Sequence, residues 1–237
     1  MAQPKQFPLP ALLLVCLLMI SLLATSPAQA AEKAKVLIIG DSISIGYTPH
    51  VRKALSERAE VKHHKGNAQH TGTGLEKLDD WLGEEEWDVI HFNWGLWDLC
   101  YRHPDSKVQG KRDKVNGTLT TPLEQYGENL DTLVSRLKET GAELIWASTT
   151  VVPTGEAGRK VDDDLRYNAM AANVMSKHGI AINDLNAVSR TFPEGLFVKP
   201  GDVHYTKEGY RKLGAVVAEA ITRKLVSEQD EATKSED

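Results

Sequence analysis

Short apolar runs rich in β-branched residues alternate along this chain with longer segments of helical periodicity, and this alternation restricts the fold more than any other feature. The apolar runs cover residues 34–39, 61–64, 87–93, 143–148 and 180–185. The helical segments cover residues 49–59, 75–82, 122–140, 162–178 and 206–226. Such alternation predicts an α/β protein, a three-layer α/β/α sandwich with a five-stranded parallel sheet. Ligands of such sheets bind at the carboxyl ends of the strands.

Two segments of the chain lack this periodicity. Residues 102–121 are polar and rich in Lys, Asp and Gly, which predicts a long loop after the third strand. Residues 227–237 are charged, which predicts a disordered acidic tail. No internal repeat and no second domain is visible, so we expect one domain over residues 31–226.

Residues 1–30 have the pattern of an export signal. Lys5 precedes an apolar run over residues 11–24, and Ala28-Gln29-Ala30 has the small-x-small form of a cleavage site. The run is shorter than the roughly 20 residues that a membrane-spanning helix needs. We therefore expect cleavage after Ala30 and a secreted or periplasmic mature protein with no stable membrane anchor. An uncleaved anchor is the alternative.

Composition narrows the classes of partner and cofactor. The 237 residues include 33 acidic and 28 basic side chains, and the net charge of -5 gives no electrostatic footprint for nucleic acid. Without residues 1–30, Cys100 is the only cysteine, which excludes an intramolecular disulfide and a cysteine-based metal site. No phosphate-binding loop is present, and the histidines lack the spacing of a metal site. We expect no metal and no organic cofactor, and the sequence carries no signal for an oligomeric state.

The first strand is followed by Gly40-Asp41-Ser42, with Gly46 four residues further on. A serine at this point stands at the carboxyl edge of the sheet, close to the backbone N–H groups at the start of a helix. Ser42 is therefore a candidate nucleophile. The alternative is that it only caps a helix beginning near Pro49.

A candidate base lies far along the chain, just before the last helical segment. His204 could take the proton of the Ser42 hydroxyl and pass it to the leaving group, while Asp202 orients the imidazole. The alternative is that Thr206 caps the last helix and His204 is a surface residue.

Together the two motifs resemble those of the SGNH hydrolase family, the GDSL-type esterases and acylhydrolases, over nearly the whole mature chain. The matching blocks are Gly40-Asp41-Ser42 with Gly46, and Asp202, His204 and Gly209-Tyr210. The resemblance implies the flavodoxin-like SGNH hydrolase fold and a Ser42–His204–Asp202 triad. The family usually has Asp-x-x-His, whereas Asp202 stands only two residues before His204. Either Asp202 still reaches the ring, or a backbone carbonyl orients it and a dyad remains.

The resemblance also implies an oxyanion hole. Residues 67–72 are similar to the second block of the family, which implies that the Gly72 amide acts with that of Ser42; a plain turn glycine is the alternative. The third block of the family supplies an Asn side chain, but Trp97 stands in its place here. Either the indole N–H of Trp97 or the side chain of Asn93 then completes the hole.

These residues indicate a secreted serine esterase that hydrolyses carboxylic esters through an acyl-enzyme intermediate. Trp94, Trp97 and Tyr101 follow the third strand, and aromatic faces suit sugar rings, so we expect a small-molecule or polysaccharide substrate with O-acetyl or other acyl groups. These aromatic residues could instead pack beneath the loop over residues 102–121. A lysophospholipase or thioesterase fits the same residues, and the altered third block leaves open a catalytically impaired, glycan-binding module.

Overall fold

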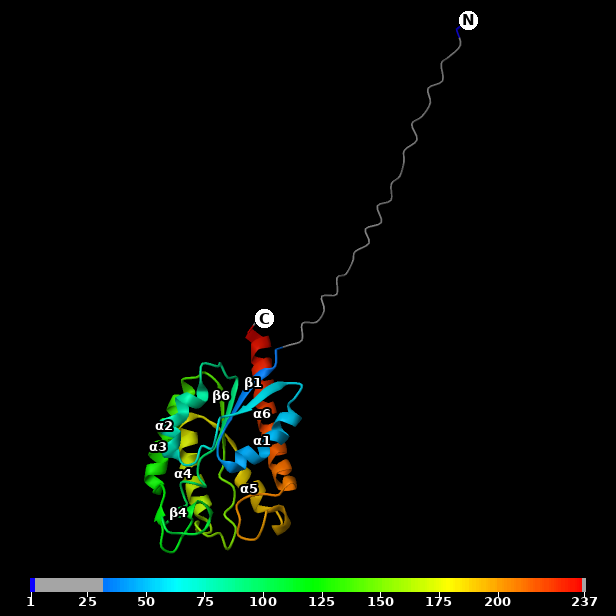
Figure 1. The fold of residues 1–237 in the computed structure, drawn as a ribbon. Coiled ribbons are helices and arrows are strands. Elements are labelled where there is room, and N and C mark those ends of the chain that lie inside the picture. Colours follow the sequence, from blue (N-terminus) through cyan, green and yellow to red (C-terminus); the bar gives the residue numbers. More distant parts are fainter. Residues whose placement is uncertain (3–31, 236–237) are drawn as a thin grey trace. The chain divides into compact units, whose positions relative to one another are not determined.

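The computed structural model describes residues 1–2 and 32–235 (Figure 1). The predicted cleavage site after Ala30 lies outside the described residues. All described helices and strands belong to the unit Lys33–Asp237. No helix in residues 32–235 has both the length and the hydropathy needed to cross a bilayer.

Five parallel strands form the central sheet, as the sequence predicts. They are β1 (Ala34–Ile39), β2 (Ala59–His63), β3 (Val89–Phe92), β6 (Glu143–Ala147) and β7 (Ala181–Asn183). Their order is β2-β1-β3-β6-β7, and every neighbouring pair is parallel. Ile38 of β1, for example, aligns with His63 on one side and His91 on the other. This is the flavodoxin-like order of a doubly wound sheet.

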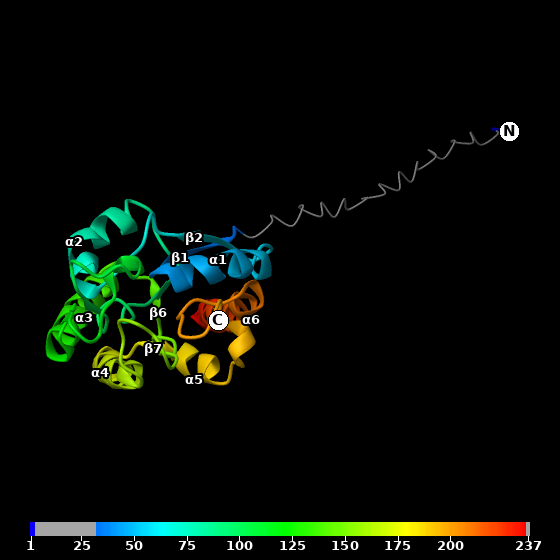
Figure 2. The same cartoon turned by 60° about the horizontal axis from the view of Figure 1, so that its bottom comes forward.

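Helices cover both faces of the sheet and complete the predicted three layers (Figures 1 and 2). One face carries α1 (Ser42–Ala54), α5 (Leu185–Arg190) and α6 (Lys207–Ser235). The other face carries α2 (Thr71–Leu82), α3 (Leu123–Lys138) and α4 (Asp163–His178). The 3-10 turns are η1 (Gln109–Lys111) and η2 (Glu194–Leu196).

The core lies between the sheet and these two helical layers. The side chains of β1 from Val36 to Ile39 are all buried, which explains why this strand reads as a continuous apolar run. Leu213, Val217 and Ile221 of α6 recur at helical spacing and are fully buried. Each such side chain contributes about 1.5–3 kcal/mol of hydrophobic stabilisation.

The chain reverses its winding direction at β1. It proceeds from β1 outward to β2 and then returns to β3 on the opposite side of β1. At such a switch point the connections after the two strands run apart and leave a crevice at the carboxyl edge of the sheet. The segments after Ile39 and after Phe92 therefore border the position where a ligand is expected.

Residues 102–121 leave the third strand as predicted, but they contain short regular elements within the predicted loop. The strands β4 (Tyr101–Arg102) and β5 (Thr118–Leu119) pair in antiparallel fashion. Backbone bonds also fix the segment to the chain around Gly158, because Tyr101 donates to its carbonyl and Lys114 donates to that of Ala157. These partners lie far away in sequence, so no local pattern indicated them.

The last helix extends further than the sequence pattern predicts. Helix α6 continues to Ser235, beyond the predicted helical segment that ends at residue 226. Residues 227–235 contain Glu, Gln, Ala and Lys without any Gly or Pro, and they therefore favour continuation of the helix.

Candidate active site

Ser42 is the first residue of α1, directly after the turn that follows β1. Asp41 is the cap of this helix, and its carboxylate accepts the amide of Ile43 at 2.9 Å. The interpretation of Ser42 as the cap of a helix beginning near Pro49 is therefore wrong, since α1 begins earlier and contains Pro49. The first amides of a helix have no partner within the helix, and their end of the helix is electropositive. Ser42 thus combines a hydroxyl with anion-binding amides.

The hydroxyl of Ser42 and the imidazole of His204 meet at this edge of the sheet. Ser42 Oγ lies 2.9 Å from His204 Nε2, and neither side chain is fully exposed. His204 belongs to the loop that leads into α6, and α6 packs against α1. At this contact Gly46 faces the ring of Tyr210 so closely that a methyl group on Gly46 would overlap it. The helix that carries Ser42 and the helix that follows His204 therefore approach each other closely at this point.

Asp202 reaches His204 despite the shortened spacing. One carboxylate oxygen, Oδ1, accepts both the ring Nδ1–H of His204 at 2.6 Å and its backbone amide at 3.0 Å. Burial disfavours the charged form of Asp202, but these two hydrogen bonds and the charges of His204 and Arg112 together outweigh it and lower the pKa of the carboxyl. The preceding Gly201 has a left-handed φ of 72° and packs against the backbone of Gly155. A side chain at Gly201 would displace the loop.

A cavity of about 300 Å³ opens beside Ser42. Both apolar and polar side chains line it, and they come from the segments after β1, β2, β3 and β6, from residues 102–112 and from the His204 loop. The lining residues are Asp41, Ser42, Asn67, Leu96, Trp97, Arg102, Gln109, Gly110, Arg112, Arg159, Val203 and His204.

Only one of the three aromatic residues predicted to bind substrate lines this cavity. Trp97 does so, and the guanidinium carbon of Arg102 lies 4.2 Å from its ring centroid. Trp94 is buried in the core, where its indole donates to the carbonyl of Ala68, so its predicted role in substrate binding is wrong. Tyr101 is half-buried beside Lys160 and is not among the residues that line the cavity.

The residues predicted for the oxyanion hole also occupy different places. The Asn93 amide group donates to the Ala147 carbonyl at 2.7 Å and to Thr149 Oγ1 at 3.4 Å, and it does not line the cavity. Both of its N–H groups are thereby used, so the structure corrects the expectation that Asn93 is an oxyanion donor. Gly72 lies in the first turn of α2, also outside the cavity lining. Trp97 does line the cavity.

Asn67 offers a donor that the sequence analysis did not single out. Its Oδ1 accepts the amide of Gln69 at 2.8 Å, which assigns the NH2 group to the other branch of the side chain. Asn67 lines the cavity together with Ser42. Its position within residues 67–72, which resemble the second family block, could have identified it.

Asp98 fixes the start of α2 near this site. It is fully buried, and its Oδ1 accepts the backbone amide of Thr71 at 2.9 Å and the Thr71 hydroxyl at 2.6 Å. Burial raises the pKa of Asp98 to about 6, although the bonds from Thr71 act in the opposite direction. The segment that carries Asn67 and Gly72 is therefore tied to the turn after β3.

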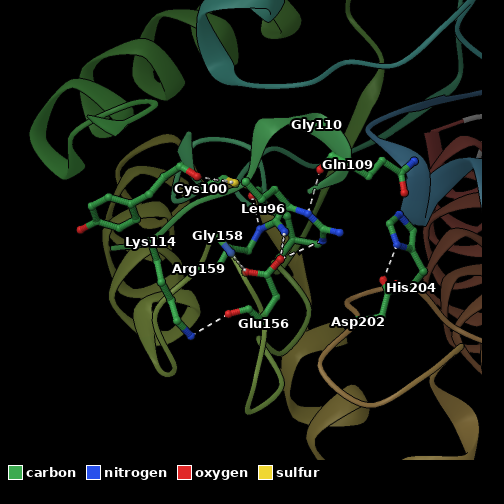
Figure 3. A network of polar contacts seen from close by, with 12 residues as sticks. Leu96, Cys100, Gln109, Gly110, Lys114, Glu156, Gly158, Arg159, Asp202 and His204 are labelled. Atoms are coloured by element: carbon green, nitrogen blue, oxygen red, sulfur yellow. Dashed lines mark hydrogen bonds and ion pairs between the residues drawn. The ribbon is translucent and has the colours of Figure 1, made fainter. Parts of the chain in front are cut away.

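Arginine side chains form one wall of the cavity. The sequence analysis did not identify these arginines. Arg112 and Arg159 donate to Oε1 of the fully buried Glu156 at 2.8 and 2.9 Å. Figure 3 shows Glu156 beside Arg159, with the Asp202–His204 pair on the other side of the site. The basic character of residues 102–114, which follow the third strand, was the one available signal.

This arrangement has the chemistry of nucleophilic catalysis. A hydroxyl is within reach of a base, the base is oriented by a carboxylate, and the Ser42 amide at the start of a helix stands beside the hydroxyl. Among residues 32–235 no group of three or more His, Cys, Asp and Glu side chains could hold a metal ion.

Comparison with known proteins places this geometry in a family context. The family described as GDSL-like lipase/acylhydrolase matches residues 38–212, a range that includes both Ser42 and His204. No curated protein matches the chain at a significant level.

Several solved structures are similar to the fold. The acetyl xylan esterase AlAXEase has a TM-score of 0.62 and 15% identity, over 79% of this chain and 99% of that chain. The lipase/acylhydrolase from Enterococcus faecalis has a TM-score of 0.64 and 19% identity, over 79% and 95%. TesA has a TM-score of 0.59 and 16% identity, over 80% and 99%. At these identities the likeness establishes the fold.

Proposed function

The chain belongs to the GDSL-like lipase/acylhydrolase family, whose hydrolases act on esters, and we propose that it cleaves carboxylic esters through an acyl-enzyme intermediate on Ser42. One observation carries the proposal: hydrogen bonds of 2.9 and 2.6 Å connect Ser42, His204 and Asp202 in series. This series has the roles of nucleophile, base and orienting carboxylate in order.

The first step follows from the tautomer that Asp202 selects. An ionised carboxylate can only accept hydrogen bonds, so the Nδ1 that faces Asp202 carries the proton and Nε2 is free to accept one. Ser42 Oγ attacks the ester carbonyl as its proton passes to His204 Nε2. The imidazolium then gives this proton to the leaving alcohol, and the acyl group remains on Ser42.

The second step reverses these transfers with water. His204 Nε2 takes a proton from a water molecule while the water oxygen attacks the acyl carbonyl. The proton then returns to Ser42 Oγ as the bond to the acyl group breaks, which releases the carboxylic acid and restores the site.

Negative charge on the carbonyl oxygen needs donors in both steps. We assign the first donor to the Ser42 amide at the start of α1. The NH2 group of Asn67 is the second candidate because it lines the same cavity. The indole of Trp97 and the amide of Gly72 remain predictions, and Trp97 is favoured of the two by its place in the cavity lining.

We propose that the substrate is an acylated carbohydrate. We also propose that the mature protein is secreted or periplasmic. The likeness to an acetyl xylan esterase supports the first, and the export pattern of residues 1–30 supports the second. Mass spectrometry of the protein recovered from its native host tests the second proposal, because a mature N-terminus at Ala31 is expected and an intact Met1 would contradict it.

Hydrolysis of 4-nitrophenyl acetate tests the proposed function. Wild-type protein should release nitrophenol and react with a fluorophosphonate at Ser42, and Ser42→Ala should lose both properties while remaining folded by circular dichroism. Ser135→Ala, which removes an exposed hydroxyl on α3, is the matched control. Full turnover by Ser42→Ala would overturn the proposal. Absence of turnover and labelling in wild type would favour a glycan-binding role for the same cavity.

A further inference from the structure

We propose that the ester accepted by this site carries an anionic group, a carboxylate or a sulfate, which the guanidinium of Arg102 binds. The inference rests on the proposed esterase function and narrows its substrate class. It concerns the wall of the cavity that residues 102–112 and 156–159 contribute.

Three arginines line the same cavity as Ser42: Arg102, Arg112 and Arg159. Arginine presents a planar fork of donors that matches the oxygens of carboxylate and sulfate groups. The concentration of this residue type in one cavity is therefore a chemical signal for an acidic ligand.

The carboxylates near this wall are already committed to other groups. Glu156 is fully buried and accepts hydrogen bonds from Arg112, Arg159 and the amide of Gly158. Asp41 caps α1 through the amide of Ile43. A third, Asp202, bonds to His204.

Arg102 is the guanidinium for which no carboxylate remains. It takes part in no ion pair within the described part of the chain, although Arg112 and Arg159 both do. One of its terminal N–H groups donates to the carbonyl of Gly110, and its guanidinium carbon lies over the Trp97 ring, 4.2 Å from the ring centroid. Its Nε is buried and has no hydrogen-bond partner among the described residues.

The surroundings of Arg102 are unfavourable for a charged guanidinium. It is half-buried, and burial, with Arg159 and Arg112 acting in the same direction, lowers the pKa of Arg102. A buried polar atom without a partner and a charge without a counter-charge are both unfavourable. An anionic substituent of the substrate would offset both costs.

The contact with Trp97 helps to hold the guanidinium in place. One face of the indole is covered by Arg102, so this face is not free to bind a sugar ring. Trp97 acts instead as a positioning residue for Arg102. Because Ser42 and Arg102 border one cavity of about 300 Å³, the anionic group must lie within one small substrate unit of the scissile ester.

Pairs of substrates that differ only in charge test the proposal. On the alcohol side, O-acetylated glucuronic acid and O-acetylated glucose 6-sulfate are compared with O-acetylated glucose. On the acyl side, the 4-nitrophenyl monoester of adipic acid is compared with 4-nitrophenyl hexanoate. The anionic member of at least one pair should be preferred by at least about tenfold in kcat/KM, the size of a charge-assisted hydrogen bond. Which pair shows the preference identifies the side of the ester and the kind of anion.

Variants then assign the preference to Arg102. Arg102→Gln should reduce the anionic-to-neutral ratio of kcat/KM by at least about tenfold, mainly through KM, and Arg102→Lys should retain part of it. Arg223→Gln, which removes an exposed guanidinium on α6, is the control and should keep the wild-type ratio. A ratio unchanged by Arg102→Gln would overturn the proposal, as would a preference of wild type for every neutral substrate.

Binding separates this inference from the proposed function. Calorimetry with the Ser42→Ala protein compares glucuronate and glucose 6-sulfate with glucose, without any turnover. If 4-nitrophenyl acetate is hydrolysed but no anion is preferred in rate or binding, the inference fails alone. If hydrolysis is absent, binding still decides the inference: stronger binding of an anion that depends on Arg102 supports it, and equal binding overturns it.

Discussion

Asp202 Oδ1 accepts two hydrogen bonds from His204, one from the ring Nδ1 at 2.6 Å and one from the backbone N at 3.0 Å. The backbone bond closes a tight local turn over two residues, a conformation that Asp side chains form readily. It also explains why a block one residue shorter than the usual family pattern still orients the imidazole. The same carboxylate oxygen fixes the position of the loop and the tautomer of the ring.

The first prediction concerns this double contact. Asp202→Asn should lower kcat by about four orders of magnitude, because a neutral amide no longer selects the Nδ1–H tautomer. The measurement is the steady-state hydrolysis of 4-nitrophenyl acetate by folded protein. Asp80→Asn, an exposed carboxylate on α2, should behave as wild type. A loss below about tenfold in Asp202→Asn would reduce the site to a Ser42–His204 dyad.

The second prediction ranks the oxyanion donors. Asn67→Ala should lower kcat by about 100- to 1000-fold with little change in KM, the cost of losing one such donor. Trp97→Phe keeps an aromatic ring beneath Arg102 and removes the indole N–H together with the five-membered ring. Asn93→Ala should lower the stability of the protein rather than kcat, since the Asn93 side-chain NH2 group donates a hydrogen bond to the carbonyl of Ala147. If Asn67→Ala retains kcat and Trp97→Phe loses it, the indole is the donor.

The third prediction separates helix packing from chemistry. Gly46→Ala should force the ring of Tyr210 away and shift α6, which moves His204 relative to Ser42. Overpacking of this kind costs about 1–3 kcal/mol of stability, and a displacement of about 1 Å in a catalytic site can cost about 100-fold in rate. We therefore expect a loss in kcat at temperatures where the variant is still folded.

A matched glycine provides the control for this packing test. A methyl group on Gly195 of η2 would meet no atom within 4 Å, so Gly195→Ala should keep the wild-type kcat and melting temperature. Wild-type kcat in Gly46→Ala would mean that the α1–α6 contact does not set the Ser42–His204 distance.

The sequence predicted the sheet and the meeting of Ser42 with His204 because both depend on periodicity and topology. Apolar runs mark buried strands, and parallel order brings the ends of distant strands to one edge. The beginning of α1 was misplaced because Pro49 is a strong signal for a first helical turn. The cap at Asp41 and the packing of α1 on α6 prevail instead, and the helix tolerates a proline inside.

The wall of the cavity could not be predicted, because contacts between segments distant in sequence build it. Trp94 and Trp97 follow the same strand, yet one enters the core and the other lines the cavity. The path of the turn after β3 decides this difference, and no periodicity encodes that path. The ion pair between Arg112 and Glu156 likewise joins two residues that are 44 positions apart in sequence.

The last prediction concerns stability against acid. His91 on β3 is fully buried, its Nε2 accepts the amide of Asn183 at 3.1 Å, and burial lowers the pKa of its imidazole to about 3. The unfolded chain binds a proton at this residue below about pH 6.5 and the native protein does not, so stability falls as the pH drops from 6.5 towards 3, by up to about 1.4 kcal/mol per pH unit. Urea unfolding between pH 7.5 and 4.5 measures this slope, which His91→Gln should flatten.

Asp98 affects the pH dependence of stability in the opposite direction to His91, and the same measurement can test it. Burial raises the pKa of its carboxyl to about 6, so the native protein takes up a proton before the unfolded chain does and gains stability as the pH falls from 6 towards 3.8. Asp98→Asn removes this gain and should steepen the acid-induced loss that His91→Gln flattens. The Asn carbonyl can still accept both bonds from Thr71, so the start of α2 should be retained. Parallel curves for wild type and both variants would show that neither buried group is responsible for the pH dependence of stability.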